Sequence, residues 1–205
     1  MTERFKLPMT SEQAYSALLA AVEAEVAFRH GKFMMNKDLE EQLRHMASWL
    51  TSDSAKFGML FCGKCGNGKS TMLKAFQHLL CCLQIPKADG TPWGLRLTDA
   101  HTIADRRKTD YTSFRKLVQA DMLGIDDLGV EPKEVLDYGN VMTPVIDVIT
   151  SRYENQLFTF ITTNLTPSQI RDRYGERIAD RLNEMVEKIV FTNPTYRLSE
   201  SEANV

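Results

Sequence analysis

The sequence predicts an α/β protein in which a parallel sheet is sandwiched by helices. The first observation is a glycine-rich loop, residues 63–68, between a short apolar run and a helical pattern. The second and third are two later apolar runs, 122–125 and 157–163, which polar side chains follow and a helical pattern separates. Because right-handed crossovers join strands that alternate with helices, we expect parallel strands with their polar residues at one edge of the sheet.

The composition fits a single domain. The chain has 205 residues, of which 43% are hydrophobic, and this allows one substantial core. Its formal net charge of −2 provides no global basic field that would attract duplex DNA or an acidic membrane. The N-terminus has no apolar signal core, and no run of about 18 apolar residues occurs. We therefore expect a cytoplasmic protein that does not contact membranes.

Two helical patterns precede the glycine-rich loop. Residues 10–28 begin with a capping box formed by Thr10 and Gln13 and carry an apolar stripe. That stripe could pack on the core or dock a partner, and core packing is the simpler expectation. A second helix is expected from about residue 36. We divide the chain into an N-terminal helical extension, a main domain and a loose C-terminal tail, at residues 1–35, 36–198 and 199–205.

The glycine-rich loop matches the phosphate-binding pattern G-x-x-x-x-G-K-[ST]. Its glycines let successive backbone N–H groups point at a triphosphate, and Lys69 adds a charge on the β- and γ-phosphates. The Ser70 hydroxyl can ligate Mg²⁺, and the following helix offers its N-terminal dipole. A plain glycine turn would not need this Lys-Ser pair, so we expect ATP and Mg²⁺ here. The expected nucleotide-binding residues are Gly63, Lys64, Cys65, Gly66, Asn67, Gly68, Lys69, Ser70 and Thr71.

The four cysteines do not indicate a metal or redox site. Cys62 and Cys65 form a C-x-x-C pattern, but they flank the first glycine of the phosphate loop. A metal or a disulfide there would compete with the backbone shape that phosphate binding demands. Cys81 and Cys82 fall on the following helical pattern. We therefore expect free cysteines in a reducing compartment.

A basic and aromatic segment follows a loop at residues 86–94 and a short strand. Its side chains suit contacts with the phosphates and bases of single-stranded DNA. A solvated helix face or loop would have the same composition, and that interpretation is slightly preferred to DNA binding. The residues concerned are Arg106, Arg107, Lys108, Tyr111 and Arg115.

The apolar run 122–125 ends in two adjacent carboxylates, Asp126 and Asp127, as a Walker B strand does. At the carboxyl end of a strand beside the phosphate loop, Asp126 is expected to hold Mg²⁺ directly or through water. Asp127 is expected to polarise the attacking water. Such a pair can also form an ordinary polar turn, but the upstream phosphate loop favours the catalytic interpretation.

The apolar run 157–163 is rich in β-branched and aromatic residues, and Asn164 follows it. A neutral polar side chain at the end of a strand can sense a γ-phosphate. A helix cap or a turn would also use asparagine, and that interpretation would be preferred without the other two motifs. Together with them, Asn164 is predicted to be the sensor.

Two further helices are expected to begin at Thr-Pro pairs, at residues 143–144 and 166–167. The second is expected to run through residue 182, which places Arg177 and Arg181 four residues apart on one side. Residues 188–192 form the expected last strand.

Together these motifs resemble the AAA+ ATPases of the DnaC helicase-loader and IstB transposition-helper group. The resemblance covers residues 38–197 and rests on GKCGNGKST, ADMLGIDDLG, SRYENQLFTFITTNL, YGERIADRL and a closing TYR. It implies an AAA+ P-loop NTPase fold with a short N-terminal helical extension and little or no C-terminal lid domain. It also implies sensor I at Asn164 and an arginine finger in the GERIADR segment, with Arg181 as first choice and Arg177 as second.

The resemblance implies an ATP-hydrolysing switch that self-associates into oligomers with a shared ATP site and loads or remodels a replicative helicase on single-stranded DNA. An IstB-like helper of a DNA transposase is the alternative, since no long N-terminal region resembles the helicase-binding domain of the loaders. A small-molecule kinase would need a substrate pocket and a mobile lid besides the same loop. A non-hydrolysing adaptor also fits, because Asp127 stands where glutamate is common in AAA+ enzymes.

Overall fold

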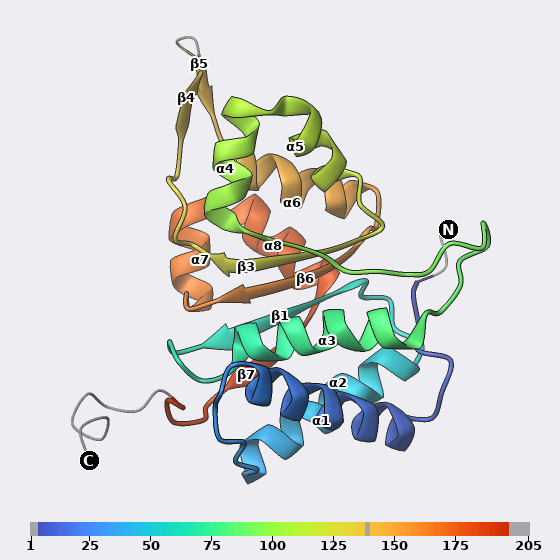
Figure 1. Ribbon diagram of the computed structural model, residues 1–205. Coiled ribbons are helices and arrows are strands. Elements are labelled where there is room, and N and C mark those ends of the chain that lie inside the picture. The colour runs from blue at the N-terminus through green and yellow to red at the C-terminus, as the bar shows by residue number, and fades with distance from the viewer. Residues whose placement is uncertain (1–3, 138–139, 197–205) are drawn as a thin grey trace.

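The structure is a computed structural model, which describes residues 4–137 and 140–196. A five-stranded sheet in the order β2-β3-β6-β1-β7 forms its centre, and all neighbouring strands are parallel (Figure 1). The strands are β1 (Gly58–Gly63), β2 (Arg96–Asp99), β3 (Met122–Leu128), β6 (Phe158–Thr163) and β7 (Val186–Phe191). The predicted parallel α/β sheet is confirmed.

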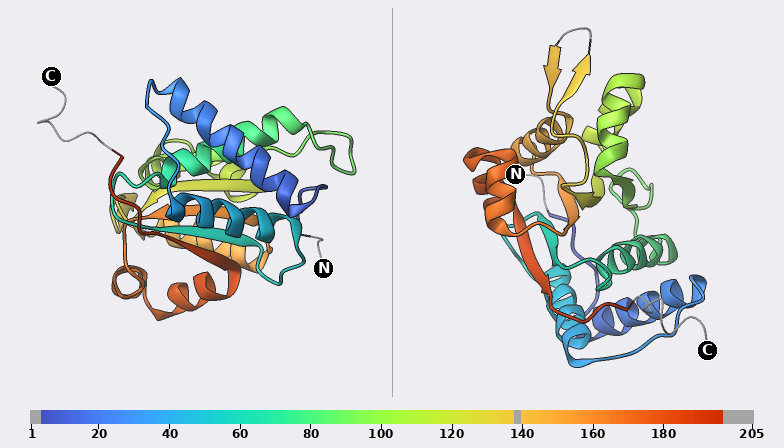
Figure 2. Two further views of the ribbon diagram at one scale, coloured as in Figure 1. Left: turned by 90° about the horizontal axis from the view of Figure 1, so that it is seen from below. Right: turned by 90° about the vertical axis from the view of Figure 1, so that its left-hand side faces the viewer.

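Helices cover both faces of the sheet. One face carries α1 (Ser11–Phe28), α2 (Lys37–Thr51) and α3 (Lys69–Leu83), which the left view of Figure 2 shows from below. The other face carries α4 (Ala100–Thr109), α5 (Tyr111–Val118), α6 (Pro144–Glu154), α7 (Pro167–Tyr174) and α8 (Glu176–Met185). Side chains of β1 alternate between the two layers, so Met59 and Phe61 join the first core while Leu60 joins the second.

The N-terminal helix packs on the body of the protein. Its residues Ala14 and Leu18 have no exposed surface and belong to the core formed with α2 and α3. The expected capping box is present, because Thr10 Oγ1 accepts from the N–H of Gln13 and the Gln13 side chain accepts from the N–H of Thr10. The apolar stripe of α1 is therefore covered by the chain's own core.

The segment expected as one helix after Thr166 is divided into α7 and α8. Gly175 between them has φ = 85° and ψ = 163°. This backbone conformation is essentially confined to glycine, and it ends α7. The basic segment is also divided between two helices, but here the break is at a cap. Asp110 ends α4 and caps α5 by accepting from the N–H of Ser113 at 2.9 Å.

A small hairpin between β3 and α6 was not expected from the sequence. Its strands β4 (Val135–Asp137) and β5 (Asn140–Met142) pair antiparallel and project from the body at the top of Figure 1. Leu136 and Val141 are opposite each other, and both are exposed. Strands this short leave too few residues for a period-two pattern to be recognised in the sequence.

The described part of the chain has no helix after β7. Arg197 of the TYR motif, the domain boundary at residue 198 and the expected tail at 199–205 lie outside the described residues. Across the residues that the structure describes, no helix is both long and apolar enough to cross a membrane.

Candidate functional site

The phosphate loop joins β1 to α3 at the carboxyl edge of the sheet, with β1 ending at Gly63 and α3 beginning at Lys69. A Cβ atom at Gly63 would lie 2.3 Å from the carbonyl oxygen of Phe191 on β7, so this position accepts only glycine. Gly68 has φ = 97° where the loop enters the helix. The loop is therefore shaped by the close approach of β7 as well as by its own turns.

Lys69 folds back over the loop and is 5% exposed. Its Nζ donates to the carbonyl oxygens of Gly63 and Lys64 at 2.8 and 2.7 Å. It also donates to Asn164 Oδ1 at 2.8 Å, which joins the loop to the end of β6. Burial lowers the pKa of the Lys69 ammonium, and the nearby Asp127 carboxylate opposes that shift. The ammonium can exchange these neutral acceptors for the oxygens of an anion.

Asn67 anchors the loop to β7. Its side chain is buried, Nδ2 donates to the carbonyl oxygen of Phe191 at 2.7 Å, and Oδ1 accepts from Lys69 at 3.1 Å. Both ends of the amide are therefore used to fix the loop. The phosphate-loop pattern leaves this position unspecified, so its role could not be assigned from the sequence.

Ser70 and Asp126 meet at the place predicted for Mg²⁺. Ser70 Oγ donates to Asp126 Oδ1 at 2.8 Å, so the two oxygens are close enough to share one ion. In the described residues, no group of three or more His, Cys, Asp or Glu side chains could hold a metal. Two protein oxygens suit Mg²⁺, which keeps several waters and takes substrate phosphates as its other ligands.

An irregularity in β3 determines the positions of Asp126 and Asp127. The pairing of β3 with β6 shifts register between Ile125 and Leu128, and Asp127 has φ = 54°. Thr162 of β6 links the two aspartates, because its hydroxyl donates to Asp126 Oδ1 at 2.5 Å and accepts from the N–H of Asp127 at 2.9 Å. Sequence reasoning missed Thr162. Its place two residues before the predicted sensor is the signal that could have found it.

The two arginines of the GERIADR segment lie on α8 in different surroundings. Arg181 Nη1 donates to Thr150 Oγ1 at 2.7 Å, and Nη2 pairs with Glu154 at 3.1 Å, both on α6. The Arg181 side chain is only 11% exposed. Arg177, in the first turn of α8, is exposed. Arg181 is therefore held within the chain, whereas Arg177 is open to solvent.

The basic aromatic segment forms part of a surface hollow. The guanidinium of Arg107 lies 4.7 Å from the ring centre of Tyr111 and 5.6 Å from that of Phe114. Both rings and Arg115 line an open hollow of about 570 Å³ between α5 and α6. Arg106 is half-buried. The guanidinium and the aromatic rings thus lie together, as a surface for bases and phosphates requires. Most of the contacts that hold them are within the segment itself.

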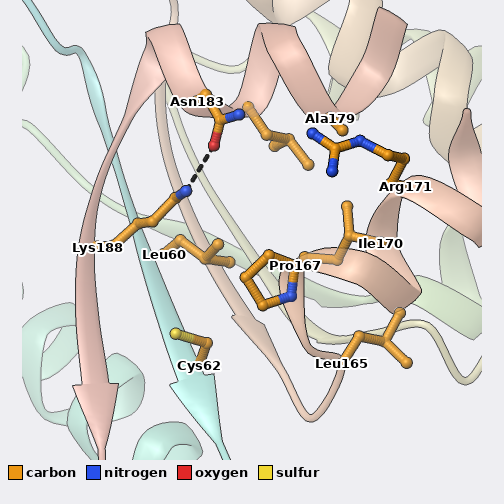
Figure 3. A pocket seen from close by; sticks show the side chains of 10 residues that line it. Leu60, Cys62, Leu165, Pro167, Ile170, Arg171, Ala179, Asn183 and Lys188 are labelled. Atoms are coloured by element: carbon orange, nitrogen blue, oxygen red, sulfur yellow. Dashed lines mark hydrogen bonds between the residues drawn. The ribbon is translucent and has the colours of Figure 1, made fainter. Parts of the chain in front are cut away.

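A separate small cavity lies between the sheet and the α7–α8 pair (Figure 3). Its volume is about 40 Å³, which is enough for a water molecule or two and far too little for a nucleotide. Cys62 and Leu165 lie on its wall, where Lys188 donates to Asn183 at 2.5 Å. The candidate site is therefore not this cavity but the open edge at the carboxyl ends of β1, β3 and β6.

Solved structures resemble this chain. The DnaC helicase loader matches with a TM-score of 0.60 and 21% identity, over 78% of this chain and 94% of that chain. DnaI matches with a TM-score of 0.56 and 21% identity, over 78% and 83%. AMPPCP-bound DnaA from Aquifex aeolicus matches with a TM-score of 0.55 and 14% identity, over 77% and 48%. No protein-family model and no curated protein sequence matches.

At these identities the likeness concerns the fold. The sheet is parallel, and the phosphate loop follows its β1 strand. The paired aspartates lie near the end of β3, and Asn164 directly follows β6. This agrees with the fold that the sequence motifs implied. The chain has the fold of the DnaC and DnaI structures.

Proposed function

We propose that this protein is an ATP-binding and hydrolysing switch of the helicase-loader type, which acts in DNA replication by loading or remodelling a replicative helicase on single-stranded DNA. One observation carries the nucleotide part of the proposal: Lys69 is hydrogen-bonded to Asn164 and Ser70 to Asp126 at one edge of the sheet. The similarity of the fold to the DnaC helicase loader supports the choice of partner.

Each residue of the proposed site has a task. The loop amides and Lys69 bind the phosphates, and Ser70 and Asp126 hold Mg²⁺, which neutralises charge on the β- and γ-phosphates when it is bound. Since Lys69 and Asn164 are already in contact, one γ-phosphate can reach both. Asp127, within the irregular part of β3, orients the attacking water and accepts its proton.

We assign the arginine finger to Arg177 in place of Arg181. A finger acts on the phosphate of a neighbouring subunit, so it must be free to leave its own surface. Arg181 would have to give up its contacts with Thr150 and Glu154, whereas Arg177 is exposed. Self-association into oligomers with a shared ATP site would bring this arginine to the γ-phosphate.

Nucleotide titration tests the phosphate loop. We expect Lys69→Ala to weaken ATP and ADP binding by about tenfold or more, because a charge-assisted contact of this type contributes about 1.5–3 kcal/mol. Lys74→Ala, which removes an exposed lysine on α3, should leave the affinity unchanged. An unaltered affinity in Lys69→Ala would contradict the assignment.

Turnover tests the chemistry. Asp127→Asn should bind ATP but hydrolyse it at least tenfold more slowly. Hydrolysis by the wild type without any acceptor molecule separates the ATPase from a small-molecule kinase. Single-turnover experiments that show bound but intact ATP would instead indicate a non-hydrolysing adaptor.

Partner identification tests the biological role. Affinity purification from native cells followed by mass spectrometry should recover a replicative helicase, and single-stranded DNA should change the ATPase rate. Recovery of a transposase in place of the helicase would support an IstB-like helper.

A further inference from the structure

Tyr196 lies at the rim of the phosphate loop. Its backbone N–H donates to the carbonyl oxygen of Gly66 at 2.9 Å. Its ring carbon Cε2 lies 3.4 Å from the position that a Cβ atom on Gly68 would take. The segment after β7, which the right view of Figure 2 shows leaving the sheet beside the start of α2, is therefore in direct contact with the loop.

The orientation of this ring is fixed by two amides. Tyr196 Oη accepts from Asn36 Nδ2 at 2.8 Å and from Asn193 Nδ2 at 2.7 Å. Asn193 is itself buried and accepts from Gln42 at 2.5 Å. Asn36 caps α2 by accepting from the N–H of Leu39 at 2.8 Å. Both amides are thus held by other bonds, so the ring cannot turn away without losing two hydrogen bonds.

Despite this support, Tyr196 as a whole residue is 41% exposed. An exposed aromatic ring that is held in one orientation loses little entropy when a planar group stacks on it. Stacking of a nucleobase on an aromatic ring contributes substantially to affinity and tolerates any base.

The sheet order determines which end of a nucleotide would reach Tyr196. The loop follows β1, which lies between β6 and β7 in the order β3-β6-β1-β7. Asp126 and Asn164, the residues for Mg²⁺ and the γ-phosphate, are on the β3 and β6 side, whereas Tyr196 follows β7. A triphosphate with its γ end at Asn164 therefore directs its base toward β7 and Tyr196.

We propose that Tyr196 is the nucleobase platform of the site and stacks on the purine ring of a bound nucleotide. This inference rests on the proposed phosphate loop. Because stacking does not read the edge of the base, the platform contributes to the affinity for adenine and guanine nucleotides alike.

Calorimetric titration with Mg-ADP, Mg-GDP and Mg-pyrophosphate tests the proposal. In Tyr196→Leu, which keeps bulk but removes the aromatic face, both nucleotides should bind about tenfold more weakly, while pyrophosphate, which has no base, should bind as to the wild type. Tyr196→Phe should retain more nucleotide affinity than Tyr196→Leu. Tyr15→Leu, at a half-buried tyrosine on α1, is the matched control and should bind all three ligands as the wild type does.

The three ligands distinguish the ways in which the proposal can fail. Unchanged ADP affinity in Tyr196→Leu would overturn the platform. An equal loss for ADP and pyrophosphate would also overturn it, because Tyr196 would then act only by shaping the loop through Gly66. If the wild type bound neither ADP nor pyrophosphate, the phosphate loop itself would be refuted. Thermal unfolding of each variant verifies that the fold is intact.

Discussion

At the scale of single residues, the Thr162 hydroxyl is the group that contacts both aspartates of the proposed site. It donates to Asp126 and accepts from the backbone of Asp127. Asp127 needs this support because its φ of 54° is uncommon for a residue other than glycine. Thr162 has no exposed surface, so no water can replace its hydroxyl without rearrangement.

We expect Thr162→Val to slow ATP hydrolysis at least tenfold with little change in ATP affinity. Valine keeps the shape but removes both hydrogen bonds, which should also lower the free energy of unfolding by about 1–3 kcal/mol. Steady-state kinetics and urea unfolding measure the two effects. Thr163→Val is the matched control, since the Thr163 hydroxyl is also buried and donates to the carbonyl oxygen of Leu128. It should lose stability to a similar degree but keep most of its turnover.

At the scale of elements, Arg152 joins α6 to two other parts of the second core. Its guanidinium has no exposed surface and donates to Thr159 and Phe158 of β6. It also donates to the carbonyl oxygens of Val118, the last residue of α5, and of Ala120. Burial lowers the pKa of Arg152 to about 9, so the group remains charged at neutral pH. The first residues of β6, the strand that leads to Asn164, are thereby fixed to α6.

Arg152→Ala should lower the free energy of unfolding by about 3 kcal/mol or more, because it leaves a cavity and several buried carbonyl oxygens without donors. Urea unfolding followed by circular dichroism measures the loss. Arg115→Ala removes an exposed arginine of α5 and should change stability by no more than about 0.5 kcal/mol. Equal stabilities of the two variants would show that the buried guanidinium contributes nothing net.

Gly175 determines where α7 ends. A Cβ atom there would meet no other atom within 4 Å, so the cost of Gly175→Ala comes from its backbone conformation alone. We expect a loss of about 1–3 kcal/mol in the free energy of unfolding. Gly94 has equal space without a positive φ, and Gly94→Ala should therefore be neutral or slightly stabilising.

At the scale of the molecule, the sequence predicted what depends on local pattern. The phosphate loop, the paired aspartates and Asn164 each follow a strand that periodicity reveals, and parallel topology then gathers them. The rest depends on contacts between distant residues. Thr162 acts across two strands, and Arg181 is held by residues of α6. Gly175 is a different case, because its effect is local: a glycine in a helical pattern does not by itself show whether the helix ends there.

The whole molecule also determines whether one subunit is sufficient for hydrolysis. In the proposed site, one chain supplies the lysine, the metal ligand, the water-orienting carboxylate and the sensor. The exposed Arg177 of α8 follows the turn at Gly175, beyond β6. An arginine supplied by the neighbouring subunit stabilises the charge that develops in the transition state and can accelerate the reaction by about 10³-fold or more. The specific activity should therefore rise with protein concentration.

Mixing two inactive variants tests the shared site directly. Arg177→Ala keeps an intact phosphate loop, and Lys69→Ala keeps an intact Arg177, so mixed oligomers should regain activity that neither variant has alone. Arg177→Ala should retain most of its ATP affinity, because the proposed finger would act on the site of the neighbouring subunit. Arg181→Ala is the comparison. The lost contacts with α6 should lower its free energy of unfolding, whereas the hydrolysis rate per folded subunit should change little. Mixtures that remain inactive, or a specific activity that dilution leaves constant, would exclude a shared site. Rescue of Arg181→Ala but not of Arg177→Ala would return the finger to Arg181.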